Sequence, residues 1–191
     1  MELLKNRICH SGQVIGNDIL KVDSFLNHQM DVQLFQEIGK EFRRRFAADK
    51  ITKILTVEAS GIGIACIAAQ YFDYVPVVFA KKFTARNLNA EVYESKVYSF
   101  TKGTHYLIRV DKKYINSSDN ILIIDDFLAN GKAVLGLLDI SRQAGAQIAG
   151  VGIVIEKSFQ EGRNVVLKEN IRLESLARIS SLKDGKITFV D

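Results

Sequence analysis

The chain has 191 residues, a length that suits one domain with at most a small subdomain. Hydrophobic residues make up 47% and charged residues 25%, which is ordinary for a globular protein and argues against disorder, collagen and coiled coil. The formal net charge of +4 is too small to indicate nucleic-acid binding and suits anionic small molecules equally well. No apolar run reaches the ~18 residues of a membrane helix, and the first residues lack the apolar segment of a secretory signal.

Cysteine and histidine usage points to an intracellular protein without a structural metal. Two cysteines, Cys9 and Cys66, cannot form a disulfide framework, which predicts a reducing cytoplasm. Cys66 lies in the apolar segment 64–68, so we expect a buried and unreactive thiol. The histidines are scattered and have no Cys/His spacing typical of zinc, so no metal site built from protein ligands is expected.

Helices and strands alternate along most of the chain. Apolar residues spaced three and four apart, with Asp31 as N-cap, predict the first long helix. This order of elements predicts an α/β fold with a mainly parallel sheet and helices on both faces. The predicted elements are helix 31–46, strand 54–57, helix 61–72, strand 75–79, strand 121–124, helix 131–145 and strand 148–155.

Two regions fall outside this alternation. Residues 82–113 are polar and rich in Tyr, Lys and Thr, which predicts a long loop followed by two exposed strands. Residues 1–30 and 158–191 flank a core of about 31–157, and we expect them to build a small lid. The whole chain, 1–191, is thus predicted to be a single domain.

The segment from 121 to 133 carries the most specific chemistry. An apolar strand ends in Asp125 and Asp126, and small residues then open a helix. Ligands of open α/β sheets bind beyond the carboxyl ends of the strands, where backbone amides and the helix dipole hold phosphate. Two carboxylates beside such amides suit a sugar phosphate; the alternative is a surface strand end with a capping aspartate. A P-loop is excluded, because no glycine lies five residues before Gly131 and Ala133 replaces the Mg-binding Ser or Thr.

This segment resembles the phosphoribosyl-pyrophosphate (PRPP) motif of type I phosphoribosyltransferases. The resemblance implies that Asp125 and Asp126 bind the ribose 2′- and 3′-hydroxyls and that the following loop binds the 5′-phosphate. Asn130, Lys132 and Ala133 stand where Thr, Gly and Thr are usual, which keeps the amides but loses hydroxyl contacts. The implied phosphate loop consists of Ala129, Asn130, Gly131, Lys132 and Ala133.

Within this family, the form Ala-Asn-Gly-x-Ala and segments 20–29 and 153–159 resemble the xanthine phosphoribosyltransferases. The resemblance covers nearly the whole chain. It implies the type I phosphoribosyltransferase fold with a lid from both termini, and an enzyme of purine salvage. That enzyme transfers the 5-phosphoribosyl group of PRPP to xanthine, giving xanthosine monophosphate (XMP) and pyrophosphate. Mg²⁺ carried by pyrophosphate and a homodimer are further expectations.

Two other strand ends are candidates for binding pyrophosphate. A glycine-containing turn after strand 54–57 places Ser60 and Gly61 at the start of a helix, and the family reading is a pyrophosphate loop. The alternative is a tight turn whose glycines serve geometry alone. Lys81 and Lys82 end the next strand, where they can neutralise the leaving pyrophosphate or form a solvated pair. Residues 83–98 are predicted to be a mobile loop that closes over the reaction.

The purine is expected at the end of the last predicted strand. Phe159 can stack on a base, and Lys157 can donate to O6 of a 6-oxopurine, which disfavours adenine; the alternative for Lys157 is an ordinary exposed lysine. The resemblance adds Asn27, whose amide suits a purine edge, and Leu20, as an apolar wall or a main-chain contact. Core packing is the alternative for Leu20. No residue is identified as a general base.

Two other functions remain open. Guanine or hypoxanthine is the nearer rival to xanthine, because the sequence does not show which group faces C2 of the purine. A non-catalytic regulator that senses PRPP or purines is the second. Such regulators need a DNA-binding element, and the roughly 30 residues before the first long helix contain no clear helix-turn-helix.

Overall fold

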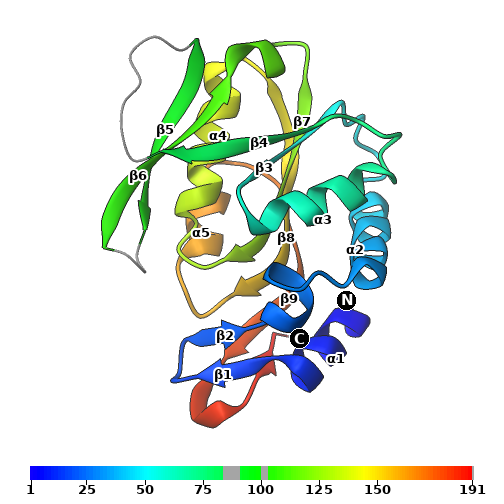
Figure 1. Ribbon diagram of the computed structural model, residues 1–191, viewed down its shortest axis with the longest axis vertical. Coiled ribbons are helices and arrows are strands. Elements are labelled where there is room, and N and C mark those ends of the chain that lie inside the picture. The colour runs from blue at the N-terminus through cyan, green and yellow to red at the C-terminus, as the bar shows by residue number, and fades with distance from the viewer. Residues whose placement is uncertain (84–90, 100–102, 191) are drawn as a thin grey trace.

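One eight-stranded sheet forms the framework of the computed structural model, which describes residues 1–83, 91–99 and 103–190 (Figure 1). The strand order is β10-β9-β8-β7-β3-β4-β6-β5. Five neighbouring strands of its centre run parallel. They are β3 (Lys53–Val57), β4 (Val77–Phe83), β7 (Asn120–Leu128), β8 (Gln147–Lys157) and β9 (Leu173–Ser181).

Helices cover both faces of this sheet, as the sequence predicted. On one face lie α2 (Val32–Arg45) and α3 (Ser60–Ala69), and on the other α4 (Lys132–Gln143) and α5 (Gly162–Leu167) (Figure 1). Alternate residues of β7 supply the two apolar cores, because successive strand residues point to opposite faces. Leu122 and Ile124 pack with α2 and α3, whereas Ile121 and Ile123 pack with α4.

The first long helix begins where its sequence signal places it. The Asp31 carboxylate accepts a hydrogen bond from the Leu34 amide at 3.0 Å, so it caps α2 as predicted. Arg7 of the first helix also donates to this carboxylate. Asp31 therefore caps α2 and also contacts the N-terminal segment beside it.

Two antiparallel strands extend the sheet beyond the helices. β5 (Val92–Ser99) pairs with β6 (Thr104–Asp111), which pairs with β4 and leads into the short helix η2 (Lys112–Tyr114). The two expected strands are present, but they are not exposed as expected, because Ile108 and Val110 are buried. The expectation of a mobile loop across 83–98 is wrong for residue 83 and for 92–98. Val97 is 2% exposed and packs against α4, which fixes this segment as a strand. Residues 84–90 lie outside the described residues.

The chain termini meet at one end of the molecule (Figure 1). We call residues 1–30 and 182–190 the hood. The α-amino group of Met1 donates to the Leu176 carbonyl at 2.7 Å, and β10 pairs antiparallel with β9. The elements of the hood are α1 (Glu2–Ser11), β1 (Gln13–Ile15), β2 (Ile19–Lys21), η1 (Asp23–Asn27), η3 (Lys183–Gly185) and β10 (Thr188–Phe189).

The expected lid boundary at 157–158 is corrected by β9. This strand pairs parallel with β8 and buries Leu173, Leu176 and Ile179, so it continues the central sheet instead of joining a lid. The reason is that its apolar side chains join the two cores of the sheet, Leu176, Ala177 and Ile179 on one face and Leu173 on the other.

The apolar helix α3 leaves its cysteine, Cys66, exposed to solvent. It buries Gly61, Ile64 and Ala68 toward the sheet, and Cys66 falls on the outer side. The expectation of a buried Cys66 is therefore wrong. Both cysteines carry free thiols. Among the described residues, no helix is long and apolar enough to cross a membrane.

Candidate active site

Two adjacent carboxylates lie near the carboxyl end of β7. Asp125 is only 4% exposed, and its Oδ1 accepts a hydrogen bond from the Asp126 amide at 3.1 Å. Oδ1 of Asp126 in turn accepts from the Phe127 amide at 2.9 Å. Burial raises the pKa of Asp125 well above its ordinary value, and the charge of Asp126 acts in the same direction. The pair thus presents carboxyl oxygens in a buried setting, where hydroxyl donors could satisfy them.

The predicted phosphate loop, residues 129–133, follows these carboxylates after Phe127 and Leu128. Gly131 is the N-cap of α4 and has φ = +76°, a left-handed conformation that favours glycine. No side chain of the described residues caps this helix, so its first amides remain available to an anion. The loop lines a pocket of about 230 Å³. The other lining residues are Val97, Tyr98, Tyr106, Phe127, Leu128 and Val134.

The start of α5 packs tightly against this loop. The Gly162 amide donates to the Ala129 carbonyl at 2.9 Å. A Cβ at Gly162 would lie 2.3 Å from that oxygen, so only glycine allows this approach. The loop is therefore held in shape by a second element as well as by α4.

The predicted pyrophosphate loop, residues 58–63, lies beside the same carboxylates. A Cβ at Gly61 would be 2.0 Å from Thr56 Oγ1 and 3.3 Å from Asp125 Oδ1. Gly61 is thus required by close packing as well as by the turn, and it brings the start of α3, including the half-buried Ser60, next to the acidic pair. Thr56 Oγ1 is buried and has no hydrogen-bond partner among the described residues.

The two candidate lysines of β4 point to opposite faces, as neighbours in a strand do. The Lys82 ammonium lies 5.7 Å from the ring centre of Tyr106, which lines the phosphate pocket. Its amide donates to the Glu58 carboxylate and so joins β4 to the pyrophosphate loop. Lys81 instead lines a separate pocket of about 340 Å³ with Phe79 and other residues. The structure therefore brings Lys82, and not Lys81, toward the acidic pair.

Tyr106 is a site residue that sequence reasoning missed. Burial raises the pKa of its hydroxyl, and the nearby Asp125 carboxylate adds to this effect. Tyr106 reaches the pocket from β6 because of the register of the hairpin, in which it pairs with Val97. No local pattern in the polar segment 82–113 signals this position.

Lys157 connects the end of β8 to both the hood and the phosphate pocket. Its ammonium donates to the Asp18 carbonyl in the β1–β2 turn at 2.6 Å and lies 5.8 Å from the ring centre of Phe127. Burial lowers the pKa of Lys157, and the Asp18 carboxylate opposes this shift. Lys157 is therefore a partly buried donor beside the pocket. Phe159, two residues further, is 40% exposed.

The two candidate purine contacts in the hood differ in their surroundings. Leu20 is 6% exposed and packs in the hood core, where its Cδ1 lies 3.2 Å from a Cβ built at Gly12. Its side chain is thus occupied, which favours the main-chain contact over the apolar wall. Asn27 ends η1 and is exposed, so its amide is accessible to a ligand.

The carboxylates can accommodate Mg²⁺ only together with substrate oxygens. In the part of the chain that the structure describes, no three or more His, Cys, Asp or Glu side chains are grouped to bind a metal ion. Mg²⁺ is usually held by one or two carboxylates together with substrate phosphates and water. Asp125 and Asp126 match that smaller requirement.

Comparison with known proteins gives a family. The phosphoribosyl transferase domain family matches residues 21–175. The xanthine phosphoribosyltransferase of Ruminiclostridium cellulolyticum is 63% identical over 191 residues, with 100% of both chains covered, and that of Clostridium novyi is 62% identical over 189 residues, with 99% of both covered. The crystal structure of adenine phosphoribosyltransferase from Rhodothermus marinus aligns with a TM-score of 0.74 over 94% of this chain and 100% of that chain, at 17% identity, and shows the shared fold. The chain therefore belongs to the phosphoribosyltransferase family, as its phosphate loop and acidic pair led us to expect.

Proposed function

We propose that the protein is a xanthine phosphoribosyltransferase, which converts PRPP and xanthine to XMP and pyrophosphate in purine salvage. The observation that carries this proposal is that the acidic pair near the carboxyl end of β7 is followed within the same segment by residues 129–133, which line a pocket. Relatives that bear this name are 57–63% identical over almost the whole chain, which supports xanthine as the base.

The proposed reaction depends on positioning and electrostatics. The loop amides hold the 5′-phosphate, and Asp125 and Asp126 accept from the ribose hydroxyls. A base nitrogen attacks C1 of the ribose as the C1–oxygen bond to pyrophosphate breaks. Negative charge then grows on the pyrophosphate, and we assign its stabilisation to Lys82 and the amides at Ser60 and Gly61. This assignment is supported by the contact of Lys82 with Tyr106 and by the close approach of Gly61 to Asp125.

Selection of the base is assigned to Lys157, Phe159, Asn27 and the main chain at Leu20. An ammonium at O6 favours 6-oxopurines, since the 6-amino group of adenine would face another donor. A buried polar group left unpaired costs about 1–3 kcal/mol, which is enough to reject the wrong purine.

Mg²⁺ enters this proposal bound to PRPP and pyrophosphate oxygens, with few or no protein ligands of its own, and it supplies positive charge to the leaving group. We further propose that the enzyme is a homodimer that acts in the cytoplasm. Its free thiols suit a reducing compartment. Sedimentation that shows only monomer at micromolar concentration would contradict the dimer.

The function is tested by measuring pyrophosphate release with Mg-PRPP and xanthine, guanine, hypoxanthine or adenine in parallel. We expect the highest kcat/KM with xanthine. Preference for another purine would retain PRPP chemistry and overturn the assignment of the base. Binding of PRPP without turnover of any base would indicate a sensor instead of an enzyme.

A further inference from the structure

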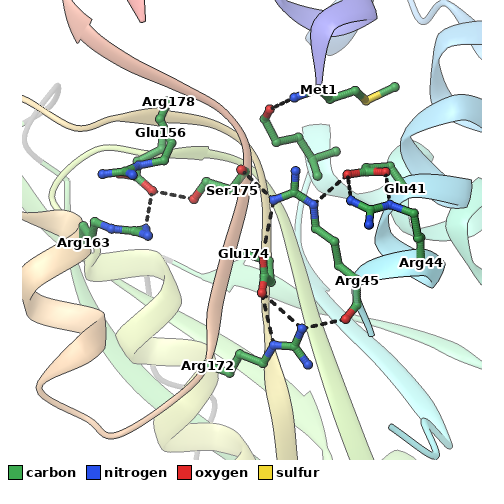
Figure 2. Close-up of polar contacts among 11 residues, drawn as sticks. Met1, Glu41, Arg44, Arg45, Glu156, Arg163, Arg172, Glu174, Ser175 and Arg178 are labelled. Carbon is green, nitrogen blue, oxygen red and sulfur yellow. Dashed lines mark hydrogen bonds and ion pairs between the residues drawn. The ribbon is translucent and has the colours of Figure 1, made fainter. Parts of the chain in front are cut away.

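A buried carboxylate lies directly before the proposed base-binding lysine. Glu156, on β8, is 0% exposed, and no step of the proposed reaction uses it. Four side chains from three segments converge on it, as Figure 2 shows in part. They are Ser158 (Oγ), Arg163 (Nη1, 2.9 Å), Ser175 (Oγ) and Arg178 (Nε, 3.2 Å).

These contacts keep Glu156 ionised. Burial raises the pKa of its carboxyl, but hydrogen bonds from Ser158 and Ser175 and the charges of Arg163 and Arg178 outweigh burial, so the pKa is lowered from its ordinary value. A buried charge is retained only when its partners are well placed, and loss of one partner leaves the others uncompensated. Glu156 therefore holds two neighbouring segments, α5 and β9, in place through their side chains.

One of these segments leads to the phosphate loop. Arg163 lies in the first turn of α5, next to Gly162, whose amide donates to the Ala129 carbonyl at 2.9 Å. Gly131 also packs here, because a Cβ at that position would lie 3.2 Å from the Gly162 carbonyl oxygen. The Glu156–Arg163 ion pair thus fixes the end of α5 that contacts the loop.

Glu156 also adjoins the residues assigned to the purine. Lys157 follows Glu156 in β8 and reaches the opposite way, to the Asp18 carbonyl of the hood at 2.6 Å. The Ser158 amide donates to the Ile179 carbonyl at 2.8 Å, which fixes the strand just beyond it. Glu156 consequently stands between the residues assigned to the purine and the loop assigned to the phosphate.

We propose that Glu156 and Arg163 are positioning residues that set the spacing between the base-binding and phosphate-binding ends of the site, by holding α5 against the phosphate loop. This inference rests on the proposed function only for the identity of the ligands. Neither side chain touches the reacting atoms. Their effect is on the shape of the loop and therefore on affinity for PRPP.

The chain offers a matched control in Arg178. This arginine donates to the same carboxylate, but it comes from β9, where it lies beside Glu156 in the parallel register. Arg163 and Arg178 are both partly exposed, with side-chain exposures of 26% and 34%. Removal of either guanidinium should cost similar stability, whereas only Arg163 is attached to the segment that contacts the loop.

The test compares Arg163→Met with Arg178→Met by calorimetric titration with Mg-PRPP in the absence of any base. We expect the Kd for PRPP to rise about tenfold for Arg163→Met and less than twofold for Arg178→Met. Hydrogen exchange of the amides in 129–133 should accelerate in the first variant alone, while Tm falls by a similar amount in both. Arg163→Lys, which keeps the cation, should recover part of the lost affinity and serves if Arg163→Met fails to fold.

Equal PRPP affinities in the two methionine variants, or an affinity loss without faster exchange in 129–133, would overturn the inference. Because no base is present, the result does not depend on xanthine being the substrate. A wild-type protein that fails to bind PRPP would instead contradict the proposed function. The two failures are therefore distinguishable.

Discussion

The proposed phosphate-binding end and the proposed base-binding end of the site, called here the phosphate end and the base end, are built in different ways. The phosphate end is one continuous segment, from Asp125 to Ala133, whose shape is fixed by Gly131 and by the contact between Gly162 and Ala129. The base end combines residues far apart in the chain, and Lys157 reaches the hood through a single hydrogen bond to the Asp18 carbonyl. The residues of one end thus come from a single segment, which α5 supports, whereas those of the other end are brought together by tertiary packing.

This difference teaches that the two ends should respond independently to mutation. Changes in the phosphate loop should alter the KM for PRPP, and changes near Lys157 should alter the KM for the base. A substitution remote from both ends should change stability alone. The following experiments test this separation.

The largest effect is expected for Asp125→Asn. Loss of a charged acceptor for the ribose hydroxyls should lower kcat/KM for PRPP about 100-fold. The same change should stabilise the free protein at pH 8, because the raised pKa of Asp125 means that its ionised form is disfavoured by folding. This penalty is absent below the ordinary carboxyl pKa and reaches its full value above the raised pKa.

Thermal unfolding of wild type and Asp125→Asn at pH 4 and pH 8 measures this second effect. Each kcal/mol of relieved penalty corresponds to about 2–4 °C in Tm. The exposed Asp139 on α4 provides the control, since Asp139→Asn should change neither the activity nor the dependence of Tm on pH. A stability difference that does not favour the variant more at pH 8 than at pH 4 would contradict the buried-charge argument.

Gly131→Ala should raise the KM for PRPP about tenfold and leave the KM for xanthine unchanged. The left-handed conformation at φ = +76° costs an L-residue roughly 1–2 kcal/mol, and relaxation of that strain would turn the loop amides away from the phosphate. Steady-state kinetics with each substrate varied provide the measurement. Gly185→Ala is the matched control, because Gly185 has φ = +70° with open space around it. An equal rise in both KM values would show that the two ends are coupled.

Lys157→Met should lower kcat/KM for xanthine five- to tenfold, with PRPP affinity retained. Burial lowers the pKa of Lys157, so the ammonium of the wild type loses its proton as pH rises toward that lowered value, and base binding weakens. The methionine variant has no ammonium group to titrate, so the ratio of wild-type to variant activity should fall at alkaline pH. A ratio that stays constant with pH would remove Lys157 from base recognition. The exposed Lys50 serves as control in Lys50→Met.

The smallest effect on activity is expected for Asp31→Ala. This change removes the cap of α2 and should cost about 1 kcal/mol of unfolding free energy, or about 2–4 °C in Tm. Both KM values should stay within experimental error of the wild type. A shift in the KM for xanthine would show that the Arg7–Asp31 contact also orients the hood.

Local patterns were sufficient for the core of the fold, and they also led to the proposed phosphate-binding segment, which stays a prediction. The β-branched segment 121–124 and the glycine-containing turns gave the parallel strands and the loops that follow them, because these signals depend on neighbouring residues. Tyr106 and the parallel pairing of β9 depend on strand register, which no single segment contains. Glu156 did leave a signal, since a carboxylate within an apolar strand must find partners.

The base end was predicted less completely for the same reason. Leu20 proved to be packed in the hood core, and Lys81 to face a separate pocket, because burial and strand direction decide what a side chain reaches. The family resemblance supplied Asn27 and Leu20, which no local pattern signalled, whereas Lys157 was predicted from its place at the end of a strand. Residues that act through distant partners are recognised from sequence only when a relative has already shown them together.

Glu156 and Lys157 point to opposite faces of β8, and this arrangement limits which insertions and deletions the strand can accept. An inserted or deleted codon within 148–156 would exchange the faces of the two side chains, sending the carboxylate toward the pocket and the ammonium into the buried cluster. Length variation among descendants of this sequence should therefore be absent from β8. It should collect instead in surface turns such as 183–185, whose residues are exposed.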